Sequence, residues 1–315
     1  VGLLGAAPWI IPAALTVGSL ARRRAWREPR EMPWIVLALW AAGVFVAAAL
    51  SSFRLPHYGL PAYFAIALLA ARGWEEQRGR GFLVLHAALF AAFALACGLA
   101  WGSDGARFMD SVLGATDIAA RKSAAAGQAA PLPEFAAFRP LLGATALVFA
   151  AGALALGACL LAFNRVSPRA RRLVPLVAVA AVMLAMLPSV SAGLSLVASH
   201  RSVSALGREL GRRAGAGDVV VHEGPIENSG ALEWYSGRRP VIVDGRRSVL
   251  AFGALRPEAR DVFRDAAWLR ETWLGGRRVW VVSVRSAERS VVASLPGARL
   301  VGAAAGRSLW VNEPR

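Results

Sequence analysis

Three side chains whose types suit an anion stand close together between two apolar stretches. Arg54, His57 and Tyr58 lie three and four residues apart, so on a helical path they share one face. A guanidinium fork beside imidazole and phenol donors suits a phosphate group. The alternative is that Arg54 extends its charge to a membrane surface, where Tyr58 belongs to an aromatic belt. The residue types leave both interpretations open.

The stretches that would position these side chains are long enough to cross a membrane. Of the 315 residues, 56 % are hydrophobic, and the mean hydropathy is +0.47. These values exclude a simple soluble enzyme, a disordered chain and a disulfide scaffold, since an ordinary globular domain is about 45–50 % apolar. A transmembrane helix needs roughly 20 apolar residues. Six candidates meet or approach this length, at residues 2–21, 34–53, 55–71, 82–102, 140–163 and 173–198.

The distribution of arginine predicts the orientation of these helices. The net charge is +16, and arginines gather in the loops 22–33, 72–81 and 164–172. Lys and Arg favour cytoplasmic loops, so we expect these loops inside and residue 54 and everything after 198 outside. The basic charge then serves orientation, and we expect the bilayer, and no nucleic acid, as its partner. An arginine on the outer face runs against this tendency, and ionisable groups at membrane depth are usually functional.

Residues 199–315 differ from residues 1–198 in composition and in the spacing of their apolar residues. Short β-type runs alternate there with helical ones, which predicts a small α/β domain. The expected strands are 218–222, 240–245, 278–284, 300–301 and 308–311, and the expected helices are 257–274 and 286–294. The predicted fold is a polytopic α-helical membrane bundle of about six helices, residues 1–198, followed by an extracytoplasmic α/β domain, residues 199–315.

The second domain carries no catalytic motif. His222 and Glu223 lack a second pair of ligands at metal spacing, and we interpret them as the solvated polar tip of a strand, with a catalytic role as the minor alternative. The sequence thus predicts no metal site and identifies no cofactor. Cys97 and Cys159 fall at opposite ends of their helices, too far apart for a disulfide, and are expected to be packing residues.

The segment around Arg54 resembles a known family. Residues 52–61, Ser-Phe-Arg-Leu-Pro-His-Tyr-Gly-Leu-Pro, are similar to the Lys/Arg-x-Pro-x-Tyr-Leu-Leu-Pro stretch of glycosyltransferase family 39 and its aminoarabinose-transferase relatives, which are cousins of the protein O-mannosyltransferases. Residues 227–240, 243–245 and 251–253 resemble the terminal domain of that group. The order of elements also matches, from an Arg-rich inner loop through the x-Pro-x-Tyr segment to an outer α/β domain.

The resemblance implies a GT-C fold and the transfer of a sugar, with inversion, from a polyprenyl-phosphate carrier to an acceptor on the outer face. The acceptor would be a membrane lipid, a glycan or a protein, and Arg54, His57 and Tyr58 would contact the donor phosphate. The protein would be a multi-pass protein of the bacterial inner membrane, with its C-terminal domain in the periplasm.

The sequence departs from the family's pattern at the catalytic base, which is an acidic residue in the first outer loop of these enzymes. Here no acidic residue precedes Glu28, and Glu28 is predicted to be cytoplasmic. We therefore expect the chain to correspond to the C-terminal half of such a transferase, without the catalytic loop, and we assign no catalytic residue.

Two other classes of function stay open as alternatives. One is a transporter or flippase subunit with an extracytoplasmic cap, and the other is a non-catalytic membrane assembly or sensor protein. A transporter should carry acidic residues or broken helices inside the membrane, yet the six predicted spans contain no Asp, Glu, Lys or Arg. A sensor should carry a cytoplasmic output domain, and no such domain is recognisable in this sequence.

Overall fold

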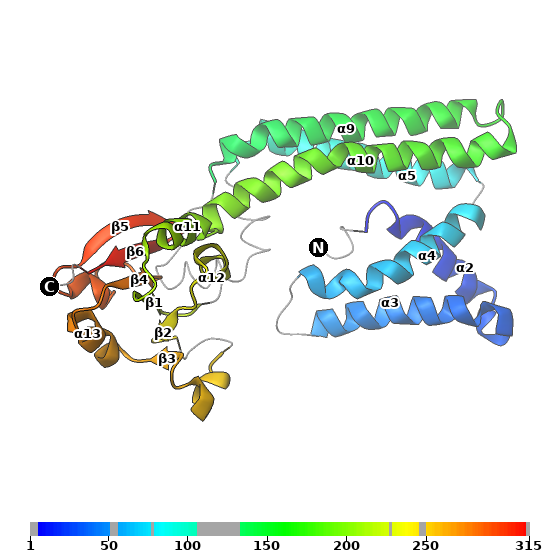
Figure 1. Ribbon diagram of the computed structural model, residues 1–315. Coiled ribbons are helices and arrows are strands. Elements are labelled where there is room, and N and C mark those ends of the chain that lie inside the picture. The colour runs from blue at the N-terminus through cyan, green and yellow to red at the C-terminus, as the bar shows by residue number, and fades with distance from the viewer. Residues whose placement is uncertain are drawn as a thin grey trace. The chain divides into compact units, whose positions relative to one another are not determined.

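The computed structural model describes residues 6–50, 56–76, 79–105, 133–226, 229–245 and 250–312. Those residues form two compact units (Figure 1). Described residues within Val1–Ala106 and Phe138–Ser191 make up the first unit, and those within Arg107–Ala137 and Ala192–Arg315 make up the second. The first unit consists of helices, and the second is built around a β-sheet.

The helices of the first unit are apolar on most of their surface. Their bounds are α2 Ile10–Arg22, α3 Met32–Leu50, α4 Leu60–Glu76, α5 Arg80–Gly102, α9 Phe135–Ala162 and α10 Pro168–Arg201, with the short 3-10 helices η1 Ala25–Arg27, η2 Pro29–Glu31 and η3 Pro56–Gly59. Ala41 is the one buried residue of α3, whereas Leu39 and Leu50 are exposed. A helix that is hydrophobic all round is typical of a membrane-embedded element.

The number of membrane-length helices differs from the predicted six. Among the described residues, four stretches are long and apolar enough to cross a membrane, at Pro29–Leu50, Arg80–Gly102, Phe135–Ala162 and Pro168–Arg201. Helix α2 has 13 residues and α4 has 17. At about 1.5 Å per residue they span about 20 and 25 Å, short of a hydrocarbon core of about 30 Å. Helix α4 is short because the chain follows a 3-10 path through Pro56–Gly59 and the α-helix begins only at Leu60.

Small residues bring α2, α3 and α4 close together. The buried cluster between them includes Ala13, Ala41, Ala62, Ala65, Ile66, Leu69 and Ala70. A side chain at Gly73 would place its Cβ 2.2 Å from the carbonyl oxygen of Pro12, so only glycine fits there. Small residues at helix interfaces allow this approach of backbones in membrane proteins.

A second cluster holds α5, α9 and α10 side by side (Figure 1). Its buried members include Trp74 of α4 and the aromatic and branched aliphatic side chains Phe82, Phe90, Phe149, Leu156 and Val179. Gly152 of α9 lies at the closest approach, since a Cβ there would meet Val182 at 2.5 Å. The first unit is therefore one bundle with two packed layers of side chains.

The second unit contains a six-stranded sheet in the order β3-β2-β1-β4-β6-β5. The strands are β1 Val219–Glu223, β2 Val241–Val243, β3 Phe263–Arg264, β4 Val279–Ser283, β5 Arg299–Ala304 and β6 Arg307–Val311, and the helices are α11 Ser204–Arg213, α12 Gly230–Ser236 and α13 Ala266–Leu274. Strands β1 to β4 pair in parallel, and β6 and β5 are antiparallel. The predicted α/β class of this part is confirmed.

Both faces of this sheet are covered. Val220 of β1 packs with Leu206 and Leu210 of α11, and the next residue, Val221, packs on the opposite face with Leu269 of α13. Successive strand residues point to opposite faces. The run of residues 219–221 in β1 is therefore apolar at every position, because both faces of the sheet are covered.

Two predicted helices of this unit are shorter than expected. The expected helix 257–274 begins only at Ala266, because Phe263 pairs with Ile242 as strand β3 and the Asp265 side chain caps the helix at the Trp268 amide, 2.8 Å away. Residues 286–294 form turns with one 3-10 helix, η7 Val292–Ser294. Both errors arise where long-range pairing overrides local periodicity.

Candidate functional site

The described structure contains only part of the predicted phosphate-binding segment. Arg54 lies outside the described residues, and of His57 the backbone alone is described, in η3. Tyr58 is 40 % exposed. The contact of these three side chains with a phosphate therefore stays a prediction.

The end of this segment is fixed against α3. The indole Nε1 of Trp40 donates a hydrogen bond to the carbonyl oxygen of Pro61, at 3.0 Å. A Cβ at Gly59 would lie 3.4 Å from the ring of Phe45, so α3 and the start of α4 are in close contact. Trp40 and Phe45 of α3 thus contact the chain where it enters α4 at Leu60, two residues after Tyr58.

A cavity of about 660 Å³ extends along one face of α4. Its lining is apolar except at one end, and comprises Ala6, Trp9, Tyr63, Ile66, Ala67, Ala70, Ala71, Trp74, Glu75, Arg172, Leu173 and Leu176. The α4 members recur at helical spacing, beginning at Tyr63, five residues after Tyr58. Five residues of helix span about 7.5 Å, so the cavity begins close to the predicted phosphate-binding segment. Its volume lies in the range of ligand pockets, about 300–1,000 Å³.

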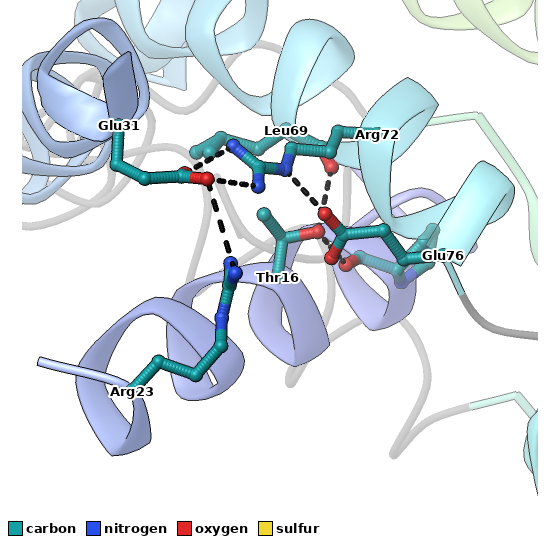
Figure 2. Close-up of polar contacts among 7 residues, drawn as sticks. Thr16, Arg23, Glu31, Leu69, Arg72 and Glu76 are labelled. Carbon is teal, nitrogen blue, oxygen red and sulfur yellow. Dashed lines mark hydrogen bonds and ion pairs between the residues drawn. The ribbon is translucent and has the colours of Figure 1, made fainter. Parts of the chain in front are cut away.

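An arginine network closes the other end of α4 (Figure 2). The Arg72 guanidinium donates from Nη1 and Nη2 to the two carboxylate oxygens of Glu31, at 2.6 and 3.0 Å, and from Nε to Glu76 at 2.6 Å. Arg23 adds a longer ion pair to Glu31 at 3.8 Å, and Arg72 lies over the ring of Trp34. The fork geometry between Arg72 and Glu31 is the strong, directional form of ion pair.

Thr16 supports this network from α2 (Figure 2). Its fully buried hydroxyl lies 3.0 Å from the carbonyl oxygen of Leu69 on α4 and 3.1 Å from that of Pro12 on its own helix. One hydroxyl hydrogen is shared between two acceptors, one on each helix, so Thr16 links α2 to α4. No local pattern predicts this pairing, because residues 16 and 69 are far apart along the chain.

The three Arg-rich loops lie at one end of the first unit. Arg72 and Glu31 join two of them, and the Trp74 indole donates to the carbonyl oxygen of Arg172 at 3.2 Å, which joins the third. Arg80 likewise donates to the carbonyl oxygen of Leu160, at 3.3 Å. Because Arg-rich and Arg-poor loops alternate along the chain, the three Arg-rich loops must share one end of the bundle. The side of the membrane that this end faces stays a prediction. From the sequence, Glu31, Arg72 and Glu76 are expected to be loop charges. The one feature that indicates an ion pair is the spacing of Arg72 and Glu76 by four residues.

The interpretation of His222 and Glu223 as a solvated strand tip is wrong. Both residues are fully buried. The Glu223 carboxylate accepts hydrogen bonds from the Ser290 hydroxyl at 2.5 Å and the Val291 amide at 2.7 Å, with Arg285 3.8 Å away. Strand β1 is central in the sheet, and residues 286–294 cover its end. Glu223 therefore fixes that covering segment.

Residue types that ligate metals do not cluster among the residues that the structure describes. No group of three or more His, Cys, Asp or Glu side chains there is placed to hold a metal ion. Cys97 and Cys159 are both free and partly buried, as expected for packing residues.

The chain is similar to known proteins both in sequence and in fold. No family model matches the chain. Undecaprenyl phosphate-alpha-4-amino-4-deoxy-L-arabinose arabinosyl transferases from strains of Pseudomonas aeruginosa are 35 % identical to it over 100 residues, which cover 28 % of this chain and 17 % of the relative.

Two solved structures share the fold. ArnT from Cupriavidus metallidurans in the apo state matches with a TM-score of 0.61 and 16 % identity, over 89 % of this chain and 46 % of that one. The same protein bound to undecaprenyl phosphate matches with a TM-score of 0.64 and 16 % identity, over 98 % and 51 %. The chain thus spans about half the length of the solved ArnT chains. The resemblance to aminoarabinose-transferase-like proteins that the sequence predicts is confirmed, as a likeness in sequence to the arabinosyl transferases and in fold to ArnT.

Proposed function

We propose that this chain is part of a membrane glycosyltransferase that takes a sugar from a polyprenyl-phosphate carrier. The likeness to the arabinosyl transferases and the four membrane-length helices support this class of enzyme. The proposed acceptor is a lipid, glycan or protein on the outer face. The proposed location is the bacterial inner membrane, with the second unit in the periplasm.

The observation that carries the proposal is the cavity along α4. A polyprenyl phosphate is an amphiphile with one anionic end and a long apolar chain. The predicted phosphate-binding segment, with Arg54, His57 and Tyr58, leads directly into the helix whose face lines an apolar cavity of about 660 Å³. Anion-binding residue types and an apolar cavity are thus adjacent along the same element.

The residues of this chain would bind and orient the donor. Arg54 would hold the phosphate through its planar fork, and Tyr63, Ile66 and Ala70 would contact the isoprenoid chain. The hydrogen bond from Trp40 to Pro61 would keep the phosphate-binding segment in a fixed position relative to the cavity. A general base must reach the acceptor hydroxyl directly or through one water, and no residue of this chain is assigned that role.

The experiment is a binding titration of undecaprenyl phosphate to the purified full chain in detergent micelles. Ala67→Trp and Ala71→Trp place an indole in the cavity, since both alanines line it from the exposed side of α4. Both variants are expected to bind undecaprenyl phosphate at least about tenfold more weakly, a loss of about 1.4 kcal/mol.

Leu68→Trp is the matched control. Leu68 neighbours Ala67 on the same helix, is 38 % exposed and does not line the cavity. This variant should bind as the unmodified chain does. Unchanged binding by both cavity variants would exclude the cavity as the site of the isoprenoid chain.

A further inference from the structure

Two further cavities lie among α5, α9 and α10, at the end of the first unit where the Arg-rich loops meet, and Trp74 of α4 also lines one of them. One, the arginine cavity, has a volume of about 370 Å³ and is lined by Trp74, Gly79, Phe82, Leu83, Phe163, Pro168, Arg169, Arg171, Arg172 and Pro175. The other, the apolar cavity, has a volume of about 400 Å³ and is lined by Leu83, Ala155, Ala158, Cys159, Ala162, Phe163, Val166, Ala170, Arg171, Val174, Pro175 and Ala178. The two share Leu83, Phe163, Arg171 and Pro175, so they adjoin each other.

The arginine cavity has positive charge without a carboxylate to balance it. Within the described part of the chain, Arg169, Arg171 and Arg172 form no ion pair with an acidic side chain, and no acidic residue lines this cavity. Arg169 and Arg171 belong to the first turn of α10 and Arg172 directly follows it, where the positive end of the helix dipole disfavours cations. An anion placed there would therefore be attracted both by the side chains and by the helix end.

Arg171 is held at the boundary between the two cavities. Its Nε donates to the carbonyl oxygen of Val166 at 3.1 Å, and its guanidinium lies 5.0 Å from the centre of the Phe163 ring. These contacts fix the plane of the guanidinium and leave its terminal nitrogens for a ligand in the arginine cavity. A guanidinium held in plane suits the oxygens of a phosphate.

We propose that the two cavities form one binding site for an anionic phospholipid. Its phosphate lies against Arg169 and Arg171, and one acyl chain enters the apolar cavity along α10. Arg171, Val174, Pro175 and Ala178 line that cavity at intervals of three and four residues, which places them along one face of the helix. Over seven residues this face is about 10 Å long.

A lipid fits these observations better than a free phosphate. A free phosphate would occupy the arginine cavity and leave the adjoining apolar cavity without a ligand, whereas a phospholipid matches the charge of the first and the lining of the second. The predicted orientation places this end at the cytoplasmic leaflet, whose anionic lipids attract basic residues near the surface.

This site adjoins the proposed donor cavity, because Trp74 and Arg172 line both. It is built on α5, α9 and the start of α10, and the two arginines proposed to hold the phosphate, Arg169 and Arg171, do not line the donor cavity. The lipid would contact three helices that otherwise meet through the cluster around Phe90 and Leu156. Its proposed effect is to hold these helices together at their Arg-rich end.

The test is native mass spectrometry of the purified, delipidated full chain, titrated with phosphatidylglycerol or with phosphatidylcholine of the same acyl chains. Phosphatidylglycerol is expected to bind more tightly. Arg169→Gln combined with Arg171→Gln should weaken its binding by about tenfold or more, since charge-assisted hydrogen bonds are lost. Arg27→Gln with Arg30→Gln is the control, because both arginines are exposed between α2 and α3 and line neither cavity.

A second variant tests the acyl-chain half of the site with the arginines intact. Ala158→Phe fills the apolar cavity and should also weaken binding of phosphatidylglycerol, whereas Leu154→Phe, at an outward position of the same helix that is 76 % exposed, should not. If the arginine variant does not fold, binding of phosphatidylglycerol to the Ala158→Phe variant tests the proposal. Equal affinity for the two lipids, or unchanged binding by Ala158→Phe, would overturn the proposal. Inorganic phosphate displacing phosphatidylglycerol at equal concentration would also overturn it, because the site would then take a free anion.

Discussion

Replacing Arg72 with alanine should destabilise the first unit more than any change to an exposed arginine. The Arg72 side chain is 12 % exposed and the Glu31 side chain 14 %, so solvent screens their pair only partly. Hydrogen bonds to charged groups contribute about 1.5–3 kcal/mol, and contact with the Trp34 ring adds about 0.5–1 kcal/mol. The expected loss in the free energy of unfolding is therefore about 2–4 kcal/mol.

The assay is thermal unfolding of the purified chain in detergent. At about 2–4 °C per kcal/mol for a unit of this size, Arg72→Ala should lower the Tm by roughly 4–16 °C. Arg72→Lys keeps the charge but cannot donate to Glu31 and Glu76 in one plane, so it should restore only part of the loss. Arg30→Ala, at an exposed position of η2, should leave the Tm within about 1–2 °C of the unmodified chain, because surface substitutions change stability by about 0.5 kcal/mol at most.

A double-mutant cycle separates the pair from general damage. Glu31→Gln and Arg72→Gln should each destabilise the chain, and the double variant should do so by less than their sum, with a coupling of about 0.5–3 kcal/mol. A coupling near zero, or an unchanged Tm for Arg72→Ala, would refute the view that the fork in Figure 2 holds α4 to the start of α3.

Three further outcomes are expected. Reporter fusions after residue 27 should indicate the cytoplasm and fusions after residue 220 the outside, and a cytoplasmic signal at 220 would reverse the predicted topology. In the proposed transferase, Arg54→Ala should weaken donor binding about tenfold to hundredfold in a titration with lipid donor, and unchanged binding would show that Arg54 is only a surface anchor. Gly73→Ala should lower the Tm, because its Cβ would lie 2.2 Å from a backbone oxygen, whereas Gly43→Ala, with open space around it, should not; equal Tm values would show that α2 can shift.

The parts of the fold that depend on local pattern could be predicted from the sequence. Apolar runs indicated the helices, and the valine-rich runs at 218–222 and 278–284 indicated β1 and β4, within a residue or two of their bounds. The alternation of arginines predicted that three loops share one end of the bundle. Each of these inferences needs only composition and spacing within one segment.

The parts that depend on distant pairing could not be predicted. Arg72 meets Glu31 across 41 residues, and Glu223 meets Ser290 across 67. Glu223 looked solvated because polar residues end most strands, and its burial became evident only once β1 proved to be a central strand. Strand β3 was missed for the same reason, since Phe263 is extended only through its pairing with Ile242.

Helix α4 combines the features on which the proposed donor site depends. The Trp40 hydrogen bond fixes its first turn, and the Arg72 network fixes its last turn. Between them, alanines pack against α2 and α3, and the cavity is lined by Tyr63, Ile66, Ala67, Ala70, Ala71 and Trp74. A helix held at both ends presents a rigid wall, and a rigid wall lowers the ordering cost of binding a flexible chain. The short length of α4 is consistent with this role, because its task in the proposal is to guide a lipid chain rather than to cross the bilayer alone.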